Sequence, residues 1–265
     1  MSGLLFWRKP RIPVIELHGM IAARVGQLNL RAVGPLIEKG FAAARKGGVV
    51  ILDIDSPGGS PVQSDLIAQL IRRRAAKAEV TVHAVIGDVG ASGGYWIACA
   101  ADRIHANPMS IVGSSGVRGG GFGFPALLAR LGVERRLYTA GANKARLDPF
   151  LPEQAEDVVF THALLDTLHA RFKSWVRERR EGRLQADEAG LFDGSFMLGE
   201  QALAAGLVDA LGDVDALVRE LGGAKARARV LRPRPPGLLR RLPRLAIEAV
   251  ADVAEERAAG PRFLG

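Results

Sequence analysis

The chain has 265 residues, which is enough for one large domain with a sizeable buried core. Hydrophobic residues make up 48% of it and charged residues 24%, which excludes a disordered or collagen-like chain. The single cysteine, Cys99, excludes a disulfide framework and a cysteine-based metal site, while the formal net charge of +8 raises the question of an anionic partner.

The positive charge is concentrated at the two ends of the sequence. Residues 1–11 carry a net charge of +3 and residues 223–265 a net charge of +6, which leaves −1 for the stretch between them. A nucleic-acid-binding domain carries basic side chains on its folded surface together with aromatic side chains for base stacking, and aromatic residues make up only 6% here. We therefore expect no nucleic-acid partner, and the basic ends favour peripheral contact with an anionic membrane.

No part of the sequence predicts a signal peptide or a transmembrane helix. The apolar patch at residues 4–7 is too short for either. The longest apolar stretch, residues 80–101, is interrupted by His83, Asp88 and four glycines. We expect a cytoplasmic protein that can lie peripherally at the inner face of a membrane.

Strands and helices alternate along the body of the sequence. Apolar, β-branched runs predict strands at residues 14–17, 49–54 and 80–86, and apolar residues at helical spacing predict helices at 30–45, 62–74 and 95–101. Further predicted elements are short strands at 103–106 and 112–117, a strand at 135–140 and a long amphipathic helix at 153–181. This alternation is typical of parallel βαβ units in an α/β fold.

One glycine-rich turn has the pattern of a nucleophile. Residues 90–94 (GASGG) match G-x-S-x-G between a predicted strand and a predicted helix. Ser92 would then lie at a helix N-terminus, where the Gly93 N–H could stabilise an oxyanion. Gly58 and Gly59 follow the preceding strand, emerge at the same sheet edge and could donate a second N–H. The alternative is that Ser92 only caps a helix in a tight turn.

A nucleophilic serine needs a base, and the sequence offers two kinds of candidate. His162 and His169 lie within the long predicted helix, where packing or an interface accounts for them better than a catalytic triad does. Lys144 follows the predicted strand at 135–140, and lysine serves as a base where its surroundings favour the neutral amine. Spacing alone favours a solvated loop lysine.

Nothing in the sequence predicts a metal or a cofactor. His83 and His105 lie in or beside predicted strands without metal-ligand spacing. Residues 121–126 (GFGFPA) match a dinucleotide-binding pattern only loosely, because Pro125 interrupts the phosphate-binding turn. We therefore expect neither a metal site nor a bound nucleotide.

Four ordered motifs resemble the signal peptide peptidase A family of serine proteases, peptidase family S49. They are residues 55–59 (DSPGG), 91–95 (ASGGY), 113–117 (GSSGV) and 141–150 (GANKARLDPF). The resemblance covers residues 13–222. It implies a ClpP/crotonase-like α/β fold of stacked ββα units, as a single domain with a long helix and a basic C-terminal extension, and it implies homo-oligomers.

The resemblance also implies a mechanism without a cofactor. Ser92 would be the nucleophile and Lys144 the general base of a Ser/Lys dyad, with Ser114 orienting the lysine. The oxyanion hole would be formed by the N–H groups of Gly93 and Gly59, with Gly58 as the alternative to Gly59. The protein would be a serine endopeptidase that forms an acyl-enzyme with peptides, such as signal-peptide remnants or unfolded protein segments.

Two alternative functions stay open. A crotonase-type acyl-CoA enzyme would use glycine amides for a thioester oxyanion but would need neither Ser92 nor Lys144, and a catalytically silent scaffold would place its basic ends on lipid. The expected organisation is a basic segment at residues 1–12, a peptidase domain at 13–222 and an Arg/Pro-rich linker with an amphipathic tail at 223–265.

Overall fold

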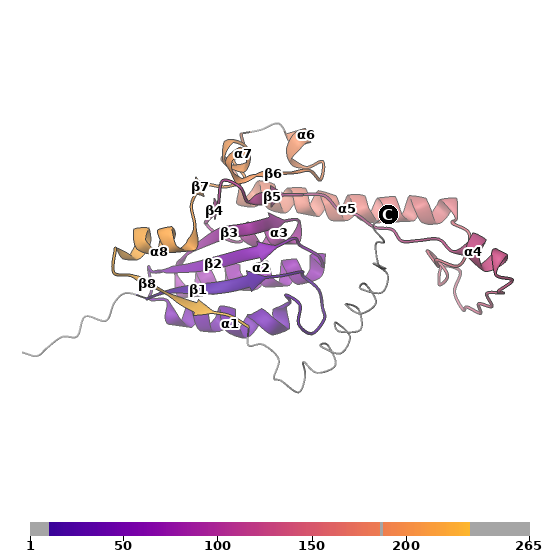
Figure 1. Ribbon diagram of the computed structural model, residues 1–265, viewed down its shortest axis with the longest axis horizontal. Helices are drawn as coiled ribbons and strands as arrows, with labels where there is room; N and C mark the ends of the chain where they lie inside the picture. Colours follow the sequence, from indigo (N-terminus) through magenta and orange to yellow (C-terminus); the bar gives the residue numbers. More distant parts are fainter. Residues whose placement is uncertain (1–10, 186–187, 234–265) are drawn as a thin grey trace, which may run out of the picture.

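A central, mostly parallel β-sheet organises the protein (Figure 1). The computed structural model describes residues 11–185 and 188–233, so most of the predicted N-terminal segment and of the C-terminal tail lies outside the described residues. The strands are β1 (Arg11–His18), β2 (Val49–Ser56), β3 (Thr81–Ala91), β4 (Arg103–Ala106), β5 (Ile111–Gly113), β6 (Phe196–Leu198), β7 (Ala210–Leu211) and β8 (Arg227–Leu231).

Strands from the C-terminal part of the chain pair with strands from its N-terminal part in one sheet. The main path of the sheet is β6-β5-β3-β2-β1-β8, and β4 pairs with β3 and β7. The strand pairs within the described residues are parallel except β5 with β6. The predicted α/β class with parallel βαβ units is therefore confirmed.

Helices cover the two faces of the sheet unequally. They are α1 (Leu30–Ala43), α2 (Pro61–Ala78), α3 (Gly93–Ala98), α4 (Pro125–Arg130), α5 (Ala155–Arg179), α6 (Glu188–Leu191), α7 (Gly199–Ala204) and α8 (Val214–Gly222). Side chains of α1, α2 and α3 form the larger core with one face. On the other face α8 forms a smaller core, in which Leu217 and Val218 pack with Val14, Ile51 and Val85.

The side chains of β2 alternate between these two cores. Val50, Leu52 and Ile54 are fully buried in the larger core, and Ile51 is buried beneath α8. Asp53 follows on the α8 side of the strand and is only partly buried. The second face of the sheet is therefore apolar where α8 covers it and charged towards the carboxyl ends of the strands.

The long helix α5 is anchored at its C-terminal end. Trp175 stacks on Trp96 of α3, with ring centroids 5.7 Å apart, and its Nε1 donates a hydrogen bond to the Trp96 carbonyl at 3.0 Å. Phe172 and Val176 are also buried there. The apolar face predicted for the whole helix is covered only in this part, and Val159 near the N-terminal end is 69% exposed.

Two other regions differ from the prediction. The strand expected at residues 135–140 is an exposed loop, because no neighbouring strand offers it a pairing partner among the described residues. Conversely, β8 lies beyond residue 222, where the sequence predicted the start of a linker. It pairs in parallel with β1, with Val230 opposite Val14.

A buried ion pair joins the end of α5 to the sheet. Arg180 is 1% exposed and donates to both carboxylate oxygens of Asp209, at 2.8 and 3.1 Å, and to the Gly206 carbonyl. Asp209 also accepts a hydrogen bond from the Ile104 N–H at 2.7 Å. Burial alone would raise the pKa of Asp209, but the hydrogen bonds from Arg180 and Ile104 outweigh it, and the pKa is lowered from its ordinary value of 3.8.

Replacement of Asp209 by asparagine is expected to lower the free energy of unfolding by about 3–5 kcal/mol near neutral pH, because Arg180 would keep a buried charge without its partner. Since the folded-state pKa of Asp209 is lowered, this stabilisation is present above pH 3.8 and is lost as the pH falls through the folded-state value. Urea unfolding of the wild type and Asp209→Asn measures both effects, with Asp166→Asn as an exposed control. Equal stability of the two aspartate variants at neutral pH would contradict the account.

Candidate active site

Ser92 occupies a strained turn between β3 and α3. Its backbone has φ 52° and ψ −120°, a conformation that a non-glycine residue adopts only when its surroundings hold it there. The Ser92 N–H donates to the Gly113 carbonyl at 2.8 Å, and the Trp96 N–H donates to the Ser92 carbonyl at 2.9 Å. The side chain makes no capping hydrogen bond to α3. The helix-cap alternative for Ser92 therefore lacks the contact that defines a cap.

The turn after β2 packs directly against the Ser92 turn. A Cβ atom on Gly58 would lie 2.7 Å from the Gly93 nitrogen and 2.8 Å from the Ser92 Cβ, so only glycine allows this approach. Gly58 and Gly59 both have positive φ, at 96° and 140°. The Ile21 N–H donates to the Gly58 carbonyl at 2.8 Å and fixes the turn from the other side.

The amide groups of these turns differ in their hydrogen bonding. The Gly58 N–H donates to the Ser56 Oγ at 3.2 Å. The Gly93 N–H belongs to the first turn of α3, which leaves its amides without intrahelical partners. Within the described part of the chain, neither Gly93 nor Gly59 donates its N–H to an acceptor. Of the candidate oxyanion donors, the geometry thus favours Gly93 and Gly59 over Gly58.

Ser114 lies one residue beyond the carbonyl that binds the Ser92 backbone. It has φ 51°, and its N–H donates to the Ser195 carbonyl at 2.8 Å. The next residue, Ser115, is fully buried, and its Oγ finds no hydrogen-bond partner among the described residues. The β5 end therefore brings hydroxyl side chains into the neighbourhood of Ser92.

Lys144 lies apart from the Ser92 turn. It is exposed and lies in the segment between α4 and α5, where its N–H donates to the Gly141 carbonyl at 3.2 Å. Figure 1 shows α4 and this segment beyond the N-terminal end of α5, away from the sheet and α3. In the described residues, no hydrogen bond or ion pair joins Lys144 to Ser92 or Ser114. One copy of the chain does not bring the predicted dyad together.

Internal contacts fold the Lys144 segment against the start of α5. Arg146 forms an ion pair with Asp157 at 2.6 Å, and Arg135 forms one with Asp148 at 2.9 Å. The Asp148 carboxyl is held at a lowered pKa by its hydrogen bond from Arg135. The segment therefore has a structure of its own although it lies apart from the sheet.

Three histidines have side-chain partners other than Ser92. His83 Nδ1 and His105 Nε2 lie 2.9 Å apart, and burial lowers the pKa of both imidazoles. Sequence spacing did not reveal this pair, and the signal that could have is their position on neighbouring parallel strands. His18 pairs with Asp53 at 3.2 Å, and this hydrogen bond raises the pKa of His18.

The described residues give little support to metal-dependent or cysteine-based catalysis. They contain no group of three or more His, Cys, Asp or Glu side chains able to hold a metal ion. Cys99 is buried, and burial raises the pKa of its thiol to about 12, so that little reactive thiolate forms. Within the described ranges, no helix has both the length and the apolar character needed to cross a membrane.

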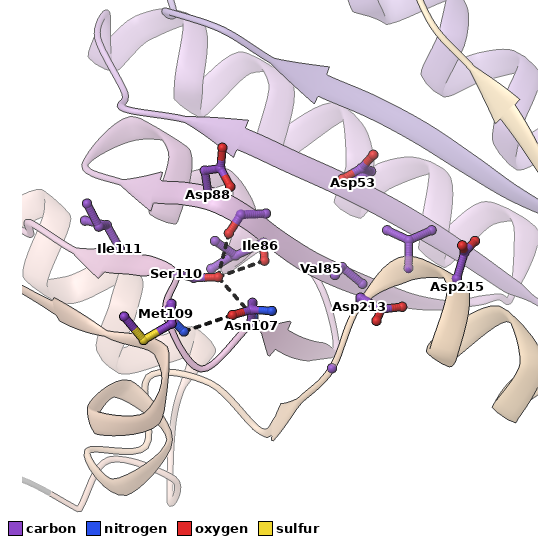
Figure 2. Close-up of a pocket in the computed structure, with 13 residues that line it drawn as sticks. Asp53, Val85, Ile86, Asp88, Asn107, Met109, Ser110, Ile111, Asp213 and Asp215 are labelled. Carbon is purple, nitrogen blue, oxygen red and sulfur yellow. Dashed lines mark hydrogen bonds between the residues drawn. The ribbon is translucent and has the colours of Figure 1, made fainter.

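A separate groove lies on the second face of the sheet. It has a volume of about 660 Å³ and is lined by side chains of β2, β3, the loop between β4 and β5, and the start of α8. Figure 2 shows four carboxylates around it, from Asp53, Asp88, Asp213 and Asp215. The groove does not include Ser92.

Comparison with known proteins identifies related chains. The family model described as peptidase family S49 matches residues 74–227. A putative protease of Synechocystis is 34% identical over 77% of this chain and 70% of its own length, and a putative signal peptide peptidase SppA of Enterococcus faecium is 32% identical over 62% and 47%. A Brucella melitensis protein named Na(+)/H(+) antiporter NhaA is 46% identical over 90% of this chain. The chain spans about a third of the length of that antiporter.

Replacement of Gly58 by alanine is expected to lower the free energy of unfolding by about 1–3 kcal/mol, because the new Cβ would have to displace the Ser92 turn and would adopt an unfavourable positive φ. Urea unfolding measures the change. Gly121→Ala is the matched control, since no atom lies within 4 Å of its added Cβ. If the two variants unfolded at the same urea concentration, the close packing of the two turns would be refuted.

Proposed function

The chain belongs to peptidase family S49, whose fold is ClpP/crotonase-like, and we propose that it is a serine endopeptidase with Ser92 as its nucleophile and Lys144 as its general base. The observation that carries this proposal is the strained turn at Ser92, whose side chain makes no structural hydrogen bond to the helix that it precedes. Backbone strain that the surrounding structure maintains is often found at catalytic residues.

The proposed reaction proceeds through an acyl-enzyme. Neutral Lys144 takes the proton of the Ser92 hydroxyl as the oxygen attacks the peptide carbonyl, and then gives it to the leaving amine. The N–H groups of Gly93 and Gly59 stabilise the oxyanion of the tetrahedral intermediate. Ser114 orients Lys144, and water then releases the acyl group from Ser92.

We propose that the dyad forms between neighbouring copies in a homo-oligomer. Lys144 is exposed on a segment that lies apart from Ser92 within one chain. The same region leaves large apolar side chains exposed, among them Phe122, Leu131, Tyr138 and Val159. Apolar surface of this extent marks an interaction site, and a second copy would bury it while bringing Lys144 to the neighbouring Ser92.

Unfolded peptides are the proposed substrates. They can present an extended backbone to the turns that carry Gly59 and Gly93 at the end of the sheet. A crotonase-type acyl-CoA enzyme would use the same glycine amides without a strained serine, and a silent scaffold would need neither. Both alternatives predict that Ser92 and Lys144 can be replaced without loss of function.

Ser92→Ala and Lys144→Ala are each expected to lower the hydrolysis of a fluorogenic peptide by at least about a thousandfold, because each removes a reacting group. Ser174→Ala and Lys225→Ala are matched controls at exposed positions and should retain wild-type rates. Full activity of either site variant would overturn the dyad.

A mixture of the two inactive variants tests whether the site is shared between copies. Co-expressed Ser92→Ala and Lys144→Ala chains should recover about a quarter of wild-type activity, because random assembly pairs an intact serine with an intact lysine of the neighbouring copy at that frequency. If each site were completed within one chain, no chain in the mixture would carry both groups, and the mixture would stay inactive. That result would refute the shared site while leaving the roles of Ser92 and Lys144 intact.

A further inference from the structure

Among the described residues, α8 is the helix that packs on the second face of the sheet, and it leaves the part beyond Val14 and Ile51 uncovered. The helix buries Val14 and Ile51 in the middle of β1 and β2. Two residues further along each strand, Glu16 and Asp53 lie opposite each other in the strand register, on the same face. This part of the sheet therefore has a charged surface where the other face has an apolar core.

The groove extends this negative surface across β3 to the start of α8. Asp53 and Asp213 have partners, the first with His18 at 3.2 Å and the second through its Oδ1 with the Ala216 N–H at 2.7 Å. Asp88 and Asp215 form no hydrogen bond or ion pair within the described part of the chain. Figure 2 shows Asp53 on β2, Asp88 on β3, and Asp213 and Asp215 at the start of α8, and all four line the same groove. Such a concave surface favours a ligand with several positive charges.

The described chain ends at the rim of the same face. β8 runs parallel to β1, and its Ala228 packs on the core beneath α8, so that Arg232 follows on that side. Arg232 forms an ion pair with Glu16 at 3.0 Å. Glu16 on β1 lies opposite Asp53 on β2, which lines the groove. Only β1 therefore separates the end of β8 from the groove.

The sequence that follows has the complementary charge. Residues 234–244 contain four arginines and no acidic residue. The extended length of such a stretch is up to roughly 35 Å. Neighbouring strands are only about 4.8 Å apart, so this stretch can reach from β8 to the far side of the groove.

We propose that the acidic groove is the docking site of the arginine-rich stretch 234–244 of the same chain. Arg232 on Glu16 starts the contact, and the later arginines meet the carboxylates of Asp53, Asp88 and Asp215. The occupant is the chain's own tail because Arg232, at the end of β8, lies on the same face of the sheet with only β1 between it and the groove, which gives the tail a high effective concentration there. The attachment is electrostatic and weakens with salt.

Limited proteolysis of the full chain with trypsin tests this proposal. Trypsin cuts after arginine except before proline, so Arg240, Arg241 and Arg244 are cleavable, whereas Arg232 and Arg234 precede prolines. Mass spectrometry of the released C-terminal fragments gives the cleavage rates. In the wild type, cleavage should be slow at low salt and should accelerate by roughly tenfold in 0.5 M NaCl, with a small chromogenic substrate correcting for trypsin itself.

Substitutions in the groove separate docking from other causes of protection. Asp88→Asn/Asp215→Asn should accelerate low-salt cleavage by roughly tenfold, since two unpartnered carboxylates are lost. Asp166→Asn/Glu200→Gln, at exposed positions outside the groove, is the matched control and should leave the wild-type rate unchanged. Circular dichroism checks that both double variants remain folded.

Three outcomes would overturn the proposal. Cleavage that is equally fast in the wild type and in the groove variant would show that the tail does not dock there. Protection that disappears on dilution would assign the bound tail to a second copy. Protection that appears only with vesicles containing an anionic phospholipid, and equally in the groove variant, would assign the arginines to a membrane surface.

Discussion

The close approach of two turns at the carboxyl ends of β2 and β3 is the constraint on which the site depends. Gly58 lies against the Ser92 Cβ and the Gly93 nitrogen at distances that leave no room for a side chain. The carbonyl of Gly113 holds the Ser92 backbone from the other side. This enclosure keeps Ser92 at a positive φ, at the same end of the sheet as Gly58 and Gly59.

The proposed reaction depends on which backbone N–H groups of these turns have no hydrogen-bond acceptor. The Gly58 N–H donates to the Ser56 Oγ, so of the three candidate donors only the Gly59 and Gly93 amides lack an acceptor among residues 11–185 and 188–233. An oxyanion would satisfy both, as it would in an acyl-transfer enzyme. Membership of peptidase family S49 supports peptide hydrolysis as the reaction proposed for this geometry, and within one chain the exposed Lys144 lies apart from it (Figure 1).

Local patterns in the sequence were sufficient for the central sheet and for the Ser92 turn. Strand β2 could be predicted because it begins with the continuous apolar run Val49–Leu52, and the turn because small residues follow a strand and precede a helix. The loop at residues 135–140 could not, since its alternating pattern lacks a neighbouring strand to pair with. The pairing of β8 with β1 and the contact of His83 with His105 depend on tertiary neighbours distant in sequence, which no local pattern reports.

The proposed function requires that the strained turn present Ser92 as a reactive serine. The most direct test is incubation of the purified protein with a fluorophosphonate, which phosphonylates activated serines, followed by peptide mapping by mass spectrometry. We expect a single adduct on Ser92, and none after denaturation in urea. An adduct on another serine, or none on the folded protein, would contradict this role of Ser92.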